Sequence, residues 1–246
     1  MAAPRPALER PAFYALAPGR LRDFVTLLHP PYTAWHLSYV LLGAAAAPVV
    51  HGGRLAATLV AFFLAVGIGA HALDELQGRP LGTGLSRRVL VALAAGSVLG
   101  AIAIGVAVMI DVSWTLLPFI VVGTFLVLAY NLEWFSGRFH TTLWFALAWG
   151  AFPALTSWWI QDLSFRLAGP LVAAGCCALS VAQRRLSTPA RELRRRTAAL
   201  TGERVGSDGE REALTAASIA APLEGALAAL SIALVLVSVG LVAVRL

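Results

Sequence analysis

Three side chains capable of acid, base or metal-binding chemistry close a long apolar run early in the chain. His71, Asp74 and Glu75 stand at positions i, i+3 and i+4, so they share one face if the run before them is a helix. Pro80 cannot continue such a helix and disfavours the helical region for Arg79, which predicts a turn directly behind the three. The first candidate site is therefore a charged hairpin between two apolar helices.

A cluster of arginines follows an apolar run late in the chain. We expect Pro189 to begin a new helix there with Thr188 as its cap, which puts Arg191, Arg194 and Arg195 on a shared face. Guanidinium forks match phosphate oxygens in pairs, so this face is either a docking site for anionic lipid headgroups or the wall of a diphosphate pocket. The run by itself favours lipid docking.

Aromatic and amide side chains form a third group. Tyr130 and Asn131 end an apolar run, where polar groups meet the membrane edge. Trp144 and Trp149 lie in the next run, whose helix is interrupted by Pro153. Aromatic walls beside such an irregularity suit a cavity for an apolar chain or a cation, and the alternative is ordinary helix packing.

The elements that must position these residues are membrane helices. The chain is 59% hydrophobic and 13% charged with a mean hydropathy of +0.77, which indicates an integral membrane protein. A span needs roughly 20 mainly apolar residues. That rule predicts an all-α bundle of about seven transmembrane helices around a central cavity open to the cytoplasm or the membrane, with spans near 33–50, 55–73, 88–110, 113–132, 141–160, 167–183 and 222–244.

Charge asymmetry predicts the orientation of the bundle. All 19 basic residues are arginine, and on the expected spans only Arg54, Arg166 and Arg245 fall on one side. The positive-inside rule then puts the amino terminus in the cytoplasm, in a bacterial-type plasma membrane. We expect a cytoplasmic segment over 1–32 with an amphipathic piece whose Leu27 lies in the lipid interface, and a single transmembrane domain over 33–246. No exposed basic domain predicts nucleic-acid binding.

A basic cytoplasmic loop is expected at 184–212, mobile over 201–212 because that part is polar and contains glycine. Glu224 follows a proline and is expected to be a first-turn helix charge. The isolated His36 is expected to be hydrogen-bonded structure rather than a ligand. Cys176 and Cys177 are adjacent in an apolar run and are interpreted as small buried hydrophobes.

Several of these segments, in order, resemble the UbiA superfamily of intramembrane prenyltransferases. Residues 70–74 (Ala-His-Ala-Leu-Asp) stand where that family has its first aspartate-rich motif, and residues 79–86 (Arg-Pro-Leu-Gly-Thr-Gly-Leu-Ser) look like its Arg-Pro-Leu segment. Tyr130 is similarly placed to the family's tyrosine, and 145–153 resembles its fifth helix. The family's second acidic motif has no counterpart, and the family usually has nine helices.

The resemblance implies an enzyme that ionises an isoprenyl diphosphate with help from metal and arginine and passes the prenyl group to an aromatic or lipid acceptor. It implies Mg²⁺ held by Asp74 and Glu75, with Tyr130 as a further catalytic residue. The expected substrate-binding residues are His71, Arg79, Asn131, Trp144, Trp149, Arg184, Arg185 and Arg191. We also expect Asp74 or Glu75 to come close to Arg184, Arg185 or Arg191.

The alternative hypothesis is a non-catalytic protein that binds a prenyl lipid, an anionic headgroup or a partner subunit. The missing acidic motif supports it. A secondary transporter is disfavoured, because such proteins place ionisable groups deep in their spans and these spans have almost none.

Overall fold

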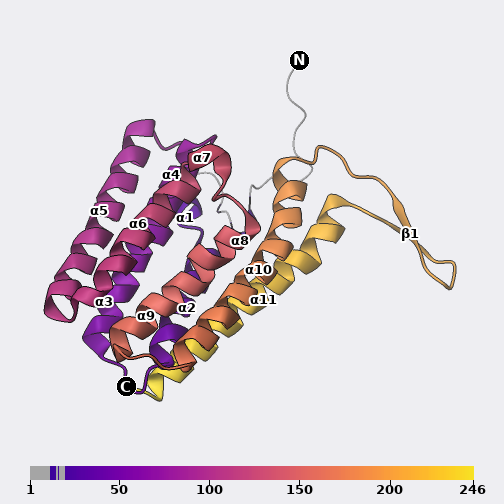
Figure 1. The fold of residues 1–246 in the computed structure, drawn as a ribbon. Helices are drawn as coiled ribbons and strands as arrows, with labels where there is room; N and C mark the ends of the chain where they lie inside the picture. The colour runs from indigo at the N-terminus through magenta and orange to yellow at the C-terminus, as the bar shows by residue number, and fades with distance from the viewer. Residues whose placement is uncertain (1–11, 15, 17–19) are drawn as a thin grey trace.

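Long helices, most of them side by side, form the body of the computed structural model, which describes residues 12–14, 16 and 20–246 (Figure 1). Within that part of the chain, five segments are long and apolar enough to cross a membrane: Gly52–Leu76, Arg87–Asp111, Trp114–Asn131, Thr142–Asp162 and Ala216–Ala243. They fit an integral membrane protein, as the composition predicts.

Three of the five segments are regular. They are α5 (Arg87–Asp111), the 3₁₀ turn η2 (Trp114–Leu116) with α6 (Leu117–Asn131), and α11 (Ala216–Ala243). The other two each contain a π-helical stretch. One is α3 (Gly52–Phe62), η1 (Phe63–Ala70) and α4 (His71–Leu76), and the other is α8 (Thr142–Phe145), η3 (Ala146–Ala151) and α9 (Phe152–Asp162).

Side-chain caps fix where several helices begin. The Ser86 hydroxyl accepts from the backbone of α5 and the Thr141 hydroxyl accepts from that of α8. Thr215 forms a reciprocal capping box at the start of α11. This cap starts α11 at Ala216, earlier than expected, so Glu224 lies in the helix interior and its assignment as a first-turn charge is wrong.

Two further helices, α2 (Pro30–Ala45) and α10 (Ala168–Arg195), pack against the five segments. α10 passes through Pro189 without a break, so the helix start predicted there is wrong, and residues 184–195 are helix rather than loop. A proline costs an interior helix about 3 kcal/mol. Packing of α10 along α9, η3 and α11 outweighs that cost.

Glycines allow two close helix contacts. A Cβ on Gly43 of α2 would lie 2.1 Å from the Ala154 carbonyl oxygen of α9, and one on Gly150 of η3 would lie 2.7 Å from the Cys176 carbonyl oxygen of α10. Small residues let membrane helices approach in this way. The His36 ring Nδ1 adds a 2.9 Å hydrogen bond to the Trp149 carbonyl oxygen, as its structural interpretation predicts.

The short helix α1 (Arg20–Leu27) lies against α4. Leu27 is buried in the main apolar core, so its predicted place in the lipid interface is wrong. The Asp23 carboxylate accepts from the backbone N–H of Gly84 at 3.1 Å and ties α1 to the turn behind α4. Part of the expected 1–32 segment lies outside the described residues.

Strands β1 (Glu203–Val205) and β2 (Arg211–Ala213) form an antiparallel hairpin between α10 and α11, where a mobile loop was expected. It extends away from the bundle in Figure 1. Its turn is closed by Gly206 and Gly209, the latter with a φ of 84°. The carboxyl terminus lies at the opposite end of the bundle from the hairpin. A short turn, α7 (Trp134–Gly137), follows α6.

Candidate functional site

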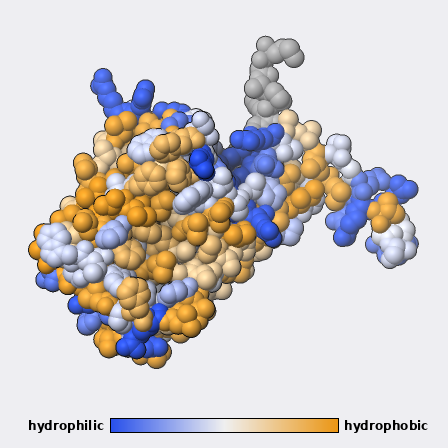
Figure 2. Space-filling view, in the orientation of Figure 1, coloured by the Kyte–Doolittle hydropathy of each residue, from blue (hydrophilic) through white to orange (hydrophobic). Residues whose placement is uncertain are grey.

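Polar side chains from five parts of the chain meet at the end of the bundle where α4 and α6 finish. We call this group the polar cluster, and its members are Tyr14, His29, Tyr32, His71, Asp74, Tyr130, His140, Arg184, Arg191 and Arg195. Hydrophilic side chains also gather near the upper end of α10 in Figure 2, between two largely apolar surfaces. The cluster brings His71 and Asp74 of the predicted hairpin together with Arg191 and Arg195 of the predicted arginine face, whereas Arg194 of that face forms an ion pair with Glu224 of α11.

Asp74 is the carboxylate of the cluster. It interacts electrostatically with His71, His140, Arg191 and Arg195. Arg191 comes from α10, so the end of the second span lies within electrostatic range of an arginine at the end of the sixth.

The two histidines beside Asp74 form a stack. The rings of His29 and His71 lie 4.3 Å apart between centroids at an angle of 24°. His71 Nδ1 lies 3.1 Å from the Gly67 carbonyl oxygen, which can only accept, so Nδ1 carries a proton. His29 is hydrogen-bonded to the Tyr14 hydroxyl. Burial lowers the pKa of His29 well below its usual value, and repulsion from His71 adds to this.

Tyr130 and Arg184 form the most direct contact in the cluster. The Arg184 guanidinium donates to the Tyr130 hydroxyl at 2.5 Å and lies 5.2 Å from the centre of the Phe145 ring, a cation–π distance. The Tyr130 ring stacks on His140 at 4.5 Å and meets the edge of Trp149 at 5.5 Å. Tyr130 is therefore held from several sides, with its hydroxyl directed toward a fixed positive charge.

Helical spacing puts three arginines of α10 in a row. Arg184, Arg191 and Arg195 are separated by seven and four residues, which returns each to the same face of the helix. Arg191 also donates to the Thr188 hydroxyl at 3.4 Å, one turn back along that face. Burial lowers the pKa of Arg195. Repulsion from Arg191 lowers this pKa further, whereas the nearby Tyr14 raises it. We call these three residues the arginine row.

Glu75 turns away from the cluster although it neighbours Asp74. Its carboxylate is fully buried and accepts hydrogen bonds from the backbone N–H of Leu81 at 3.0 Å and from the N–H and hydroxyl of Thr83, both at 2.8 Å. The shared helical face predicted for His71, Asp74 and Glu75 thus splits. Glu75 closes the turn, while Asp74 faces Arg191 and Arg195 and His71 stacks on His29.

Arg79 closes the same turn from outside. Its φ of 53° is left-handed, and its guanidinium donates to the carbonyl oxygens of Thr83 and Leu85, both at 2.9 Å. With Glu75 inside and Arg79 outside, the segment over residues 79–86 is a compact structural loop. The turn predicted from Pro80 is confirmed, and Arg79 is engaged in its backbone.

The remaining predicted site residues lie in three different settings. Asn131 is buried and donates to the Val127 carbonyl oxygen of its own helix at 2.7 Å. Arg185 is exposed, on a different face of α10 from Arg184. Trp144 packs against the main core beside Phe139, with 4.8 Å between ring centres. None of these contacts by itself tests a role in binding.

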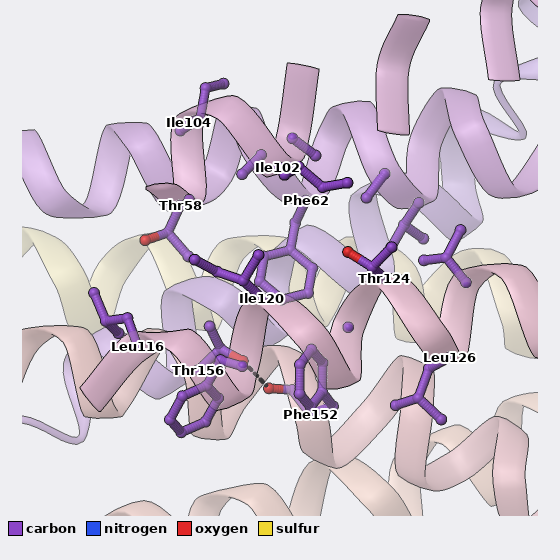
Figure 3. Close-up of a pocket in the computed structure, with 18 of the residues that line it drawn as sticks. Thr58, Phe62, Ile102, Ile104, Leu116, Ile120, Thr124, Leu126, Phe152 and Thr156 are labelled. Atoms are coloured by element: carbon purple, nitrogen blue, oxygen red, sulfur yellow. Dashed lines mark hydrogen bonds between the residues drawn. The ribbon is translucent and has the colours of Figure 1, made fainter. Parts of the chain in front are cut away.

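An apolar cavity of about 870 Å³, counting its open part, lies among α3, α5, α6, η3 and α9. Phe62, Ile120 and Phe152, from three of these elements, line it in the close-up (Figure 3). Trp149 also belongs to its wall. Because Trp149 also packs against Tyr130, the wall of the apolar cavity adjoins the polar cluster at this side chain.

The fit of the predicted magnesium ligands can be judged from the donor set. Both oxygens of Glu75 are engaged by backbone or hydroxyl donors of the loop. Among the residues that the structure describes, no group of three or more His, Cys, Asp or Glu side chains could hold a metal ion. The residues present therefore do not fit the two-carboxylate site that the resemblance implies.

Sequence reasoning did not assign Tyr14, His29, Tyr32 and His140 to the site, and it placed Arg195 on the arginine face without naming it as a substrate-binding residue. The spacing of Arg195 from Arg184 and Arg191 was a usable signal, since positions seven and eleven residues on share a face. The others come from turns and helix ends, where spacing carries no such information. Comparison of the chain with protein-family models, curated proteins and solved structures finds no match.

Proposed function

We propose that this protein binds an isoprenyl diphosphate in the membrane, with the diphosphate at the polar cluster and the prenyl chain in the apolar cavity. The observation that carries the proposal is the position of Trp149, which lines the cavity and contacts Tyr130. An amphiphile with an anionic head and an apolar tail matches this pairing.

We infer that the protein is a divergent UbiA-like prenyltransferase. In the reaction, the bond between the allylic carbon and the diphosphate oxygen breaks, and its electron pair leaves with the diphosphate. The acceptor then bonds to that carbon and releases a proton. Arg184 and Arg191 would stabilise the charge that develops on the leaving group, and the ring faces of Phe145 and Trp149 would stabilise the allylic cation. The acceptor is an aromatic or lipid molecule that reaches the site from the membrane.

The second candidate function is binding without catalysis. It is favoured by Glu75, whose carboxylate maintains a loop rather than facing the cluster, and by the missing second acidic motif. Such a protein would hold a prenyl lipid or an anionic headgroup in the same place. The two functions share a binding site and differ in turnover.

In either function we place seven helices across the membrane, α2 and α10 with the five apolar segments, and the polar cluster on the cytoplasmic side. The arginines of the 77–88 turn and of the end of α10 support this orientation. A substrate would then enter from the cytoplasmic leaflet.

Binding to purified protein tests the proposal. An isoprenyl diphosphate should bind at least tenfold tighter than the prenyl alcohol of the same chain, because an anionic head adds charge-assisted contacts of about 1.5–3 kcal/mol each. Arg191→Gln should remove most of that difference. Arg196→Gln is the matched control, because Arg196 is exposed at the end of the same helix.

The cavity is tested separately. Thr124→Phe would fill the cavity beside Ile120, whereas Val122→Phe changes an exposed position of the same helix. We expect the first substitution to weaken binding of a long prenyl chain and the second to leave it unchanged. If the diphosphate binds no better than the alcohol, the polar cluster is not a diphosphate site. If it binds but no acceptor, water included, gives turnover, the non-catalytic function is correct.

A further inference from the structure

The apolar cavity runs along the helices of the bundle. Its wall takes in residues from 98 to 108 of α5, from 116 to 127 of η2 and α6, and from 148 to 160 of η3 and α9. At about 1.5 Å per residue, each of these stretches is about 15–18 Å long. Leu116 and Leu126 lie at opposite ends of the close-up (Figure 3). The cavity is therefore elongated, which suits an extended chain.

One end of the cavity adjoins the polar cluster. Val127 and Trp149 line the cavity at this end and belong to the same apolar core as Tyr130. The rings of Trp149 and Tyr130 meet with 5.5 Å between their centres. An anionic head at the polar cluster would thus place the first carbons of its tail at this end.

Leu116 and Ile160 close the other end, and we call this pair the cavity floor. Both residues line the cavity, with 4% and 5% of their surfaces exposed, and both pack with Met109 in a separate apolar cluster. Trp159 Nε1 donates to Thr115 Oγ1 at 3.0 Å, which ties α9 to η2 beside the floor. A chain that enters from the polar cluster meets packed side chains here.

Three threonines provide the hydroxyls of the cavity wall: Thr58, Thr124 and Thr156. Thr58 donates to the Arg54 carbonyl oxygen at 2.7 Å, and Thr156 donates to that of Phe152 at 2.8 Å, the bond drawn in Figure 3. Both hydroxyl protons are thus engaged within their own helices. The rest of the wall is mainly aliphatic and aromatic, so it suits an occupant that is hydrocarbon along its whole length.

The distance from the polar cluster to the floor sets a length for that occupant. Tyr130 and Leu116 are fourteen positions apart along η2 and α6, which corresponds to about 21 Å. A carbon–carbon bond of about 1.5 Å advances an extended chain by roughly 1.25 Å, so about 16 backbone carbons span this distance. Because each isoprene unit supplies four backbone carbons, the cavity matches a tail of four units.

We propose that the cavity floor limits the prenyl chain of the ligand to about four isoprene units, so that geranylgeranyl diphosphate is the longest ligand that fits fully. The inference rests on the proposed function, because the diphosphate holds the first carbon at the polar cluster, and it deepens that function by stating the chain length. Leu116 and Ile160 determine this specificity, since they meet the last isoprene unit.

A series of diphosphates tests the limit on the purified protein. The probes are the geranyl, farnesyl, geranylgeranyl and geranylfarnesyl diphosphates, with two to five isoprene units, and the corresponding alcohols. We expect Kd to fall at each step up to the geranylgeranyl chain, because each unit buries more apolar surface. The fifth unit should raise Kd about tenfold, because it must displace the packed floor.

Two substitutions should move the limit in opposite directions. Leu116→Ala removes part of the floor, so the geranylfarnesyl chain should bind about as tightly as the geranylgeranyl chain. Ile120→Phe fills the cavity one turn, about 6 Å, nearer to the polar cluster, so the rise in Kd should come at the fourth unit. Leu117→Ala is the matched control, because Leu117 is exposed beside Leu116. Partitioning of the probes into detergent is common to all variants and cancels in the ratio of Kd values.

The outcomes separate this inference from the proposed function. A limit at four units that moves with both substitutions supports both. Diphosphates that bind better than their alcohols at every length, with no rise in Kd at the fifth unit, overturn the length limit and leave the proposed function standing. Diphosphates that bind no better than the alcohols overturn the proposed function and remove the anchor on which the limit depends. Thermal unfolding identifies a variant that fails to fold, and the chain series with the other variant then decides.

Discussion

The buried carboxylate of Glu75 holds the loop behind α4 together. It accepts three hydrogen bonds from Leu81 and Thr83, and each charge-assisted bond of this kind is worth about 1.5–3 kcal/mol. Glu75→Gln keeps the size of the side chain, but its amide group would face an N–H donor. We expect the variant to unfold at a clearly lower temperature.

Asp74→Asn is the natural comparison for that experiment, because it changes the adjacent carboxylate without touching the loop. Its thermal midpoint should stay close to that of the unaltered protein. A Glu75→Gln protein that melts at the temperature of the unaltered protein would mean that the hydrogen bonds of Glu75 do not hold the loop together.

His29 makes the stability of the folded protein depend on pH. Burial holds its folded-state pKa well below the usual value of about 6.5, and His71, Arg191 and Arg195 repel a charge there. The stability that depends on neutral His29 is fully present above pH 6.5 and is lost as the pH falls toward the folded-state pKa. We expect the free energy of unfolding to fall between pH 7 and pH 5, by at most about 1.4 kcal/mol per pH unit from this residue, and the thermal midpoint to fall with it.

His29→Asn should reduce that drop. Asparagine tolerates the left-handed conformation of residue 29, where φ is 46°, and it does not titrate. His51→Asn is the control, since His51 is exposed and also precedes a helix. An unchanged pH slope in His29→Asn would show that other groups cause the acid sensitivity.

At the scale of elements, the pair Arg194 and Glu224 joins α10 to α11 beside the polar cluster. Both side chains are mostly buried, with 16% and 12% of their surfaces exposed. Removing one partner of a buried pair typically costs about 3–5 kcal/mol, whereas replacing both with apolar residues can be nearly neutral. We therefore expect Glu224→Met to be destabilised and Arg194→Met with Glu224→Met to recover part of the loss, measured as thermal midpoints.

The exposed hairpin pair Arg204 and Glu212 is the control for this cycle, because surface pairs contribute little. Glu212→Gln should change the midpoint by less than a degree or two, about 0–1 kcal/mol. Strictly additive effects of the Arg194 and Glu224 substitutions would mean that the pair does not hold the two helices together.

The five apolar segments could be predicted from the sequence because length and hydropathy decide them. The course of α10 through Pro189 could not, since packing along neighbouring helices, invisible in the local sequence, outweighs a local penalty. Within the candidate site, the spacing of His71 and Asp74 predicted their common face. The departure of Glu75 from that face follows from hydrogen bonds to Leu81 and Thr83, which only the folded loop provides.

At the scale of the whole molecule, charge is divided between the two ends of the bundle. Arg54, Arg166 and Arg245 lie near the end with the carboxyl terminus, where Arg54 donates to the Ile160 carbonyl oxygen and Arg245 to that of Ala47. The other arginines, which sequence analysis assigned to the cytoplasm, include the arginine row and the hairpin residues Arg204 and Arg211. The division agrees with the positive-inside rule.

Membrane-impermeant thiol labelling of intact cells tests the resulting topology. In a background with Cys176 and Cys177 replaced by alanine, Ser207→Cys in the hairpin should be protected and Leu246→Cys should react from outside. Permeabilised cells should label at both sites. Labelling of both sites from the same side would show that the last segment does not cross the membrane once.

The π-helical stretches η1 and η3 have a consequence for how this chain would align with others. A π turn spans one residue more than an α turn between hydrogen-bonded partners, so the residues after it are rotated about the axis relative to a continuous α-helix. Deleting one residue from Phe63–Ala70 would let the helix rewind as a continuous α-helix and would leave His71 and Asp74 on their present face, whereas forcing the existing residues into an α-helix would turn both by about 100°. A protein with the same architecture but unbroken α-helices would therefore match this one on both sides of each stretch only if a one-residue gap is placed inside it.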